Sequence, residues 1–308
     1  MATPLLPLLA AMDKAGASDM FITEGKPPAA RIHGQVRITS EPPTTGEAIQ
    51  SFLEQVLPEP ARQRFLASGD LDVGIPLSEG RRLRLALMRQ QGAMAMVGRP
   101  VPSGAIELGS LGLPEGLRSF VEQPRGLILV AGATGSGKST TLAALLHQVN
   151  RSRAAHIVTI EDPVEFVHSD LRSRVTQREV GSDTLSFHSA LRHVVRQSPD
   201  VILIGELRDA ETVRVALSAV LTGHLVLASI HASDTTQTVQ RLLAYFPEDQ
   251  RAQAALDLSL SLVGILSQRL LPRSDSKARV LATEILSGTP TVARLLREQR
   301  VEELQDLL

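Results

Sequence analysis

One eight-residue segment, residues 132–139 (GATGSGKS), limits what this chain can fold into more than any other feature of it. It matches the pattern G-x-x-x-x-G-K-[ST] at every position. The apolar run Leu127 to Ala131 precedes it, and leucines with helical spacing follow it at Leu142, Leu145 and Leu146. The segment is therefore expected to join a buried strand to a helix, which requires an α/β fold in this part of the chain.

A turn of this kind points backbone N–H groups at phosphate oxygens, and the helix that follows adds positive potential at its N-terminus. We expect Lys138 to neutralise the β- and γ-phosphates of ATP and the Ser139 hydroxyl to ligate Mg²⁺. The chain has 32 lysines and arginines, and one of its few lysines stands where the pattern requires it. The predicted nucleotide-binding residues are Gly132, Thr134, Gly135, Ser136, Gly137, Lys138, Ser139 and Thr140.

Two further apolar runs end in carboxylates. Val201 to Ile204 leads to Glu206, and His156 to Ile160 leads to Glu161 and Asp162. Because the carboxyl ends of parallel strands meet at one edge of a sheet, these acids are expected near the phosphate-binding turn. One acid would hold Mg²⁺ and another would activate the attacking water. Solvated strand ends or helix caps are the alternative interpretation.

Two histidines, His224 and His231, flank the apolar run Leu225 to Ser229. A histidine near the γ-phosphate could sense ATP, but a lone histidine beside a sheet is more often structural. The residues themselves leave both interpretations open.

The chain divides by composition. Residues 1–99 have the pattern of a small mixed α/β domain, with strands at Met20 to Thr23, Ala30 to Ile38, Arg82 to Leu87 and Ala93 to Val97. Glycines and prolines crowd residues 100–114, which we interpret as a linker. Residues 115–308 alternate strands with helices, as in a parallel sheet with right-handed crossovers. Within them we expect Pro247 to Leu271 to be mostly helical and Arg279 to Leu286 to be a strand.

Composition excludes several classes of site. The chain has no cysteine, so disulfides, thiol nucleophiles and cysteine-ligated zinc are ruled out. Its formal net charge of −1 argues against binding nucleic acid mainly through phosphates. The longest uncharged stretch, Val215 to Ser233, contains Thr222-Gly223-His224, so we expect a helix, a turn and a strand and no transmembrane segment.

The motifs together resemble the ATPases of the type II secretion and type IV pilus superfamily. The segment 159–166 (TIEDPVEF) is similar to their Asp box, and 200–209 (DVILIGELRD) to their Walker B segment. Thr222-Gly223-His224 through Ser229-Ile230-His231 is similar to their His box. Residues 18–23 (SDMFIT) and the stretch from Gly288 to Glu298 resemble the pilus retraction branch, which is called PilT/PilU-like.

This resemblance implies a small PAS-like N-terminal domain, a RecA-like P-loop ATPase domain, and ATP with Mg²⁺ as ligands. It implies Glu206 as the Walker B acid and metal ligand with Ser139, Glu161 as the residue that polarises water, and His231 as a sensor. It also places arginines of the N-terminal domain near the triphosphate, where Arg82, Arg84 and Arg99 are the candidates. A solvated strand face in an arginine-rich chain explains these arginines equally well.

The implied protein is a hexameric motor that retracts type IV pili and drives twitching motility. Its implied partners are a PilC-like inner-membrane platform protein and a paralogous retraction ATPase, and its implied place is cytoplasmic, at the inner-membrane pilus machine. An extension or type II secretion ATPase is the first alternative, although those relatives typically carry a tetracysteine zinc element. A RecA-like nucleic-acid motor and a nucleotide-binding subunit that regulates another motor are weaker alternatives.

Overall fold

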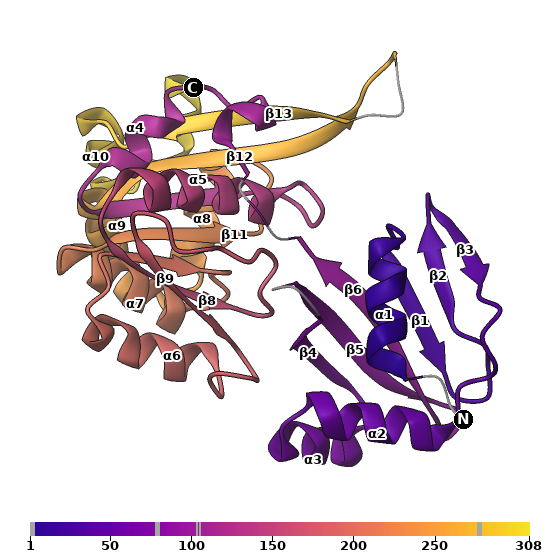
Figure 1. Ribbon diagram of the computed structural model, residues 1–308. Coiled ribbons are helices and arrows are strands. Elements are labelled where there is room, and N and C mark those ends of the chain that lie inside the picture. Colours follow the sequence, from indigo (N-terminus) through magenta and orange to yellow (C-terminus); the bar gives the residue numbers. More distant parts are fainter. Residues whose placement is uncertain (1–3, 78–80, 103, 105, 276–278) are drawn as a thin grey trace. The chain divides into compact units, whose positions relative to one another are not determined.

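The computed structural model describes residues 4–77, 81–102, 104, 106–275 and 279–308, and these form two compact units (Figure 1). One unit comprises the N-terminal part of the chain together with the short segments Pro163–Val167 and Gly181–Asp183, and the other comprises the remainder. Each unit has its own β-sheet, so the prediction of a mixed α/β fold with a small N-terminal domain is confirmed.

The N-terminal unit has one antiparallel sheet with strand order β3-β2-β1-β6-β5-β4. Its helices and strands are α1 (Leu5–Lys14), β1 (Asp19–Thr23), β2 (Ala29–Ile32), β3 (Gln35–Ile38), α2 (Gly46–Val56), α3 (Glu59–Ser68), β4 (Leu71–Pro76), β5 (Arg82–Gln90) and β6 (Ala93–Val101). Along β5 the buried side chains of Leu83, Leu85 and Leu87 alternate with half-buried ones. This period of two is typical of a sheet with one face in the core.

The segment from Ala30 to Ile38, predicted as one strand, is a hairpin of β2 and β3. Its turn is formed by His33 (φ 51°) and Gly34 (φ 79°), a pair of left-handed residues that suits the twist of a two-residue hairpin loop. The sequence signal was weak because the first of these residues is a histidine, which adopts positive φ much less readily than glycine.

The C-terminal unit has a seven-stranded sheet with order β13-β12-β7-β11-β10-β8-β9. All neighbouring pairs from β12 to β9 are parallel, and the edge strand β13 pairs antiparallel with β12. The elements are η1 (Leu108–Leu111), α4 (Leu117–Glu122), β7 (Gly126–Ala131), α5 (Lys138–Ser152), β8 (His156–Glu161), β9 (Arg174–Glu179), α6 (Phe187–Val194), η2 (Val195–Gln197), β10 (Val201–Ile204), α7 (Ala210–Leu221), β11 (Leu225–Ile230), α8 (Thr235–Ala244), α9 (Glu248–Ser261), β12 (Leu262–Pro272), β13 (Arg279–Ser287), α10 (Pro290–Arg297) and η3 (Val301–Leu307).

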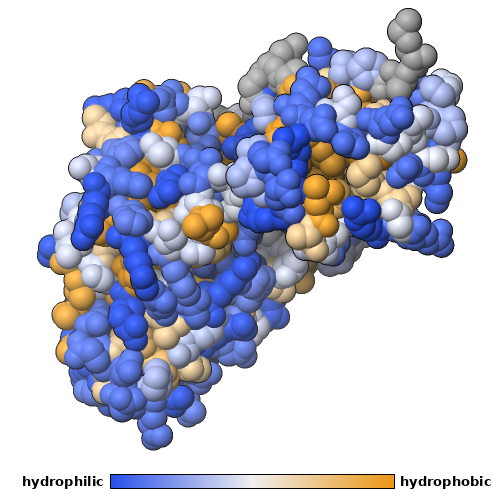
Figure 2. All heavy atoms as spheres, turned by 90° about the horizontal axis from the view of Figure 1, so that it is seen from below, coloured by the Kyte–Doolittle hydropathy of each residue, from blue (hydrophilic) through white to orange (hydrophobic). Residues whose placement is uncertain are grey.

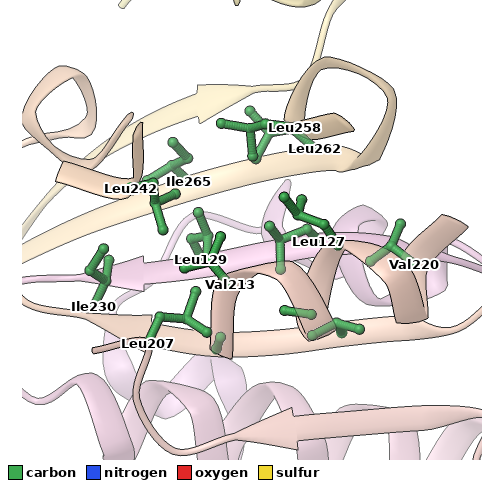
Figure 3. Close-up of a cluster of buried hydrophobic side chains, with 14 of the residues drawn as sticks. Leu127, Leu129, Leu207, Val213, Val220, Ile230, Leu242, Leu258, Leu262 and Ile265 are labelled. Atoms are coloured by element: carbon green, nitrogen blue, oxygen red, sulfur yellow. The ribbon is translucent and has the colours of Figure 1, made fainter. Parts of the chain in front are cut away.

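Both faces of this sheet are buried. Leu127 and Leu129 of β7 pack into a cluster with residues of α7, α8 and α9 (Figure 3), whereas Ile128 and Val130 pack into a second cluster with α4 and α5. All six residues of β7 are buried, which is why its sequence is continuously apolar instead of alternating. Because both faces are packed, each strand cannot slide along its own direction, and this fixes where its end lies and where the following loop begins.

The prediction that Pro247 to Leu271 is mostly helical is wrong for its second half. Helix α9 ends at Ser261, and β12 begins at the next residue. No glycine or proline separates them, so the usual signal for the end of a helix is missing. Gly264 lies within the strand at a register shift against β7.

The uncharged stretch from Val215 to Ser233 is a helix, a turn and a buried strand, as expected: α7 ends at Leu221 and β11 begins at Leu225. Over the described ranges, no helix is long and apolar enough to cross a membrane. Figure 2 shows one face of the molecule, largely covered by hydrophilic residues, with apolar residues in small groups.

Substituting Gly264 by alanine is expected to destabilise the C-terminal unit. An added Cβ would overlap the Phe120 ring and lie 3.0 Å from the Leu286 carbonyl oxygen. Because the core is close-packed, we expect the free energy of unfolding to fall by about 1–3 kcal/mol in urea denaturation. The control is Gly109→Ala, where nothing lies within 4 Å of the new methyl group. Equal stability of the two variants would contradict this packing.

Candidate functional site

The parallel register brings four strand ends to one edge of the C-terminal sheet. Strands β7, β11, β10 and β8 are consecutive neighbours. Ala131 pairs with Ile230, and Ile204 pairs with both Ala228 and Ile160. The residues at or just after the ends of these strands therefore lie along the same edge, as predicted for parallel strands: Gly132, His231, Gly205 with Glu206, and Glu161.

The glycine-rich segment between β7 and α5 forms a tight loop. A Cβ on Gly132 would overlap the Ser136 hydroxyl and lie 2.6 Å from the Gln268 carbonyl oxygen. Gly137 is the N-cap of α5 in a left-handed conformation (φ 91°). The Ser136 N–H donates to the Ala133 carbonyl (3.2 Å). The first N–H groups of α5, at Lys138 and the residues after it, face this loop without intrahelical acceptors.

Lys138 is buried at this helix start, with 8% of its surface exposed. Its Nζ donates to the carbonyl oxygens of Gly132 (2.9 Å) and Ala133 (3.1 Å) and lies 3.4 Å from Nδ1 of His231. Two of these contacts are neutral carbonyls of the loop itself. An ammonium group held in this way can exchange the two carbonyls for an anionic ligand, and the interaction with the anion is electrostatically more favourable.

His231 connects Lys138 to Glu206. Its Nε2 lies 3.2 Å from Oε1 of Glu206. Because the lysine ammonium can only donate, Nδ1 must be the acceptor, and we assign the neutral tautomer that donates from Nε2 to the carboxylate. The second oxygen of Glu206 accepts from Nε of Arg208 (2.9 Å), and Nη1 of the same arginine lies 3.7 Å from Oδ2 of Asp162. A polar chain thus crosses the ends of β7, β11, β10 and β8 in order.

Glu161 ends β8, one strand beyond Glu206. Its Oε1 accepts from the Thr159 hydroxyl (2.6 Å) and from Nε2 of Gln177 (3.1 Å). Gly205 lies against it, where a Cβ would be 3.4 Å from the Glu161 Cα. These contacts restrain the carboxylate at the edge that carries the glycine-rich loop.

The remaining predicted loop residues differ in exposure. Thr134 and Gly135 are exposed at the turn, and Ser139 and Thr140 are half-buried in the first turn of α5. His224, by contrast, lies at the opposite end of β11, where its Nδ1 contacts the Ala219 carbonyl (2.8 Å) at the end of α7. The structural interpretation therefore fits His224.

The three predicted arginines lie in the N-terminal unit, on one face of its sheet. Arg82 and Arg84 alternate with buried leucines of β5, and Arg84 pairs in register with Arg99 of β6. Nη2 of Arg99 lies 2.7 Å from Oδ1 of Asp19. Burial alone would raise the pKa of Asp19, but hydrogen bonds from Arg99 and from Ser18 hold that pKa below its usual value. Arg99 therefore has a structural role in its own unit.

One residue that sequence reasoning missed is Gln268 on β12, whose Nε2 donates to the Ser136 carbonyl (2.8 Å). The sequence does not indicate it, because its segment has a helical pattern and a single glutamine matches no motif.

The residues of this edge fit a nucleotide phosphate chain and a divalent cation. The loop offers backbone N–H donors in a positive-φ conformation that requires glycine at Gly132 and Gly137, and Lys138 offers a buried cation. The hydroxyl of Ser139 and the carboxylate of Glu206 are oxygen ligands of the kind that Mg²⁺ prefers.

Comparisons with known proteins identify the family of this chain. A family model described as type II/IV secretion system protein matches residues 74–305. The chain is 40% identical to the type IV pilus retraction ATPase PilT of Pseudomonas aeruginosa over 297 residues, which are 96% of this chain and 86% of PilT. It is also 40% identical to the type IV pilus ATPase PilU of that organism, over 98% of this chain and 79% of PilU.

Among solved structures, the chain is similar to the pilus retraction motor PilT with bound ADP. The TM-score is 0.92 at 39% identity, and the match covers 99% of this chain and 89% of that one. The chain therefore belongs to the family of type II/IV secretion ATPases. Within this family it is similar to the PilT and PilU retraction ATPases over nearly its whole length.

Asp209 fixes the loop that carries Glu206 and Arg208, and removing it is expected to cost stability in a pH-dependent way. As N-cap of α7 it accepts from the Thr212 N–H (2.8 Å), and it lies 3.2 Å from His188. Burial raises its pKa, but the hydrogen bonds from Thr212 and His188 outweigh this and leave the pKa below 3.8. Asp209→Ala should lower the free energy of unfolding at pH 7 by about 1 kcal/mol.

Because the folded-state pKa of Asp209 is lowered, its contribution is complete above pH 3.8 and disappears as the pH falls through the folded-state value. The stability difference between wild type and Asp209→Ala, measured by urea denaturation at several pH values, should shrink accordingly. Asp209→Asn is the matched control, because asparagine also caps helices. A difference that stays constant down to pH 2.5 (on the order of a unit below the usual aspartate pKa) would contradict the assignment.

Proposed function

We propose that this protein is a Mg²⁺-dependent P-loop ATPase that drives retraction of type IV pili, and with it twitching motility. The observation that carries the proposal is the chain of contacts from Lys138 through His231 to Glu206 along one sheet edge. The near-full-length similarity to PilT supports pilus retraction as the process that the motor drives.

The phosphate groups of ATP would bind to the loop from Gly132 to Gly137 and the start of α5. Lys138 would leave the carbonyls of Gly132 and Ala133 and donate to the β- and γ-phosphates instead. Ser139 and Glu206 would hold Mg²⁺, whose charge neutralises the phosphoryl oxygens when it is bound. His231, which contacts both Lys138 and Glu206, would then lose or change two hydrogen bonds at once, which suits a sensor of nucleotide state.

Glu161 is our candidate for orienting the attacking water and accepting its proton, because Thr159 and Gln177 hold one of its oxygens in place. Arg82, Arg84 and Arg99 are candidates for stabilising charge on the transferring phosphoryl group. For Arg99 that role would require breaking its bonds to Asp19.

The working form would be a homo-hexameric ring that acts on a PilC-like inner-membrane platform protein, together with a paralogous retraction ATPase. These partners rest on the similarity to PilT and PilU and not on a surface of this chain.

Replacing Glu206 by glutamine is expected to separate binding from hydrolysis. The amide keeps the shape of the side chain but removes the charge that faces His231 and Arg208 and that would hold Mg²⁺. The variant should bind nucleotide and hydrolyse ATP about 100-fold more slowly, or slower still, in a phosphate-release assay. Glu248→Gln, at the exposed start of α9, serves as control. Normal turnover in Glu206→Gln would remove this residue from the site.

The biological role can be tested in the source organism by replacing the chromosomal copy with Lys138→Ala. If the motor retracts pili, the cells should carry more pili than wild type and fail to twitch, because assembly continues without disassembly. Lys26→Ala, an exposed lysine of the N-terminal unit, is the control. Cells without pili would instead indicate an extension ATPase, and normal pili with normal twitching would argue against either role.

A further inference from the structure

Strand β12 ties two loops of the site together through three consecutive residues. The Ser267 hydroxyl donates to the Ser233 carbonyl (3.2 Å), and Nη2 of Arg269 donates to the same oxygen (2.9 Å). Between them, Nε2 of Gln268 donates to the Ser136 carbonyl of the glycine-rich loop (2.8 Å). Ser233 is two residues beyond His231, so β12 contacts both the glycine-rich loop after β7, which we call the phosphate loop, and the loop after β11 that carries His231.

Gln268 is almost completely enclosed, with 1% of its surface exposed. Its Oε1 is buried and has no hydrogen-bond partner within the described ranges. An unpaired buried polar atom costs roughly 1–3 kcal/mol, so an apolar residue would suit this position better if packing alone decided it. The Nε2–H bond to Ser136 is the contact that an apolar residue could not make.

The loop is shaped around this side chain and its backbone. A Cβ at Gly132 would lie 2.6 Å from the Gln268 carbonyl oxygen, and a Cβ at Gly137 would lie 3.1 Å from Nε2. Two glycines of the phosphate motif therefore leave room for Gln268, in addition to any room they leave for phosphate.

The bond to Ser136 also controls a neighbouring donor. In a trans peptide the C=O of Ser136 and the N–H of Gly137 belong to one plane and point in opposite directions. Drawing the carbonyl toward β12 turns the Gly137 N–H away from β12. A backbone N–H at this position of a glycine-rich loop is one of the donors that can face a phosphate oxygen.

We propose that Gln268 is a positioning residue that orients the Ser136–Gly137 peptide and so prepares the phosphate loop for nucleotide. This inference rests on the proposed function, because it assumes that the loop binds nucleotide. Gln268 acts through the loop and touches neither the nucleotide nor the reacting atoms.

Two variants of Gln268 test this inference in the full-length protein. Gln268→Glu keeps the shape but places an oxygen against the Ser136 carbonyl, and Gln268→Met keeps the volume without a donor. Both should raise the Kd for Mg-ADP and the KM for Mg-ATP about tenfold, while kcat changes much less, because a preorganised donor has been lost and the catalytic groups have not. Ser261→Ala is the control, since it removes another buried polar group, immediately before the same strand, that has no hydrogen-bond partner within the described ranges.

The outcomes separate this inference from the proposed function. If wild type binds no Mg-ADP, the proposed function fails and takes the inference with it. If wild type and Ser261→Ala bind but both Gln268 variants bind equally well, the function stands and the inference is overturned. The inference is also overturned if the Gln268 variants have lower melting temperatures than wild type but the same affinity for Mg-ADP per folded molecule. If the glutamate variant does not fold, the methionine variant decides between these outcomes.

Discussion

The structure depends on the parallel register of β7, β11, β10 and β8, which is set by burial on both faces of the sheet. Sliding any one of these strands by a residue would turn its apolar side chains from one packed face to the other. A change of register would therefore cost much packing energy, and the strand ends stay at fixed positions along the strand direction. The glycine-rich loop, His231, Glu206 and Glu161 are held along one line because the strands beneath them cannot move independently.

The residues along this sheet edge also carry opposite charges at its two ends. Lys138 stands at one end, buried and held by loop carbonyls, and Glu206 with Arg208 stands two strands away. His231, in the tautomer assigned above, accepts a hydrogen bond from Lys138 and donates one to Glu206, so it connects the two without adding charge. A ligand that draws the lysine away from His231 also changes the environment of Glu206. If the loop binds phosphate and Glu206 binds Mg²⁺, as we propose, this contact couples the two binding events, which a nucleotide-driven motor requires of its site.

Much of this could be predicted from the sequence, since the motif, the strands and their terminal acids are local patterns with a physical meaning. The strands β7, β8, β10 and β11 are strongly marked because a strand covered on both faces has to be continuously apolar, and the glycine-rich loop is marked by its motif. The roles of Lys138, Glu161 and Glu206 remain predictions that their geometry supports.

Features that depend on distant contacts could not be predicted in this way. The junction of α9 and β12 has no glycine or proline at its boundary, so the sequence predicts helix where Gln268 lies. Gln268 donates a hydrogen bond to a loop 132 residues earlier in the chain, a contact that no local pattern indicates. The turn at His33 was missed because its positive φ is set by the hairpin and not by residue preference. The pairing of Arg99 with Asp19 joins two strands 80 residues apart, which no local pattern indicates.

The most direct test of the site is calorimetric titration of the purified full-length protein with Mg-ADP, comparing wild type with Lys138→Met. Methionine keeps most of the length of the side chain and removes the ammonium that lies between the loop carbonyls and His231. Saturable binding by wild type, with affinity reduced at least about tenfold in the variant, is the predicted result. Equal affinity in the two proteins would contradict the assignment of this sheet edge as the nucleotide site.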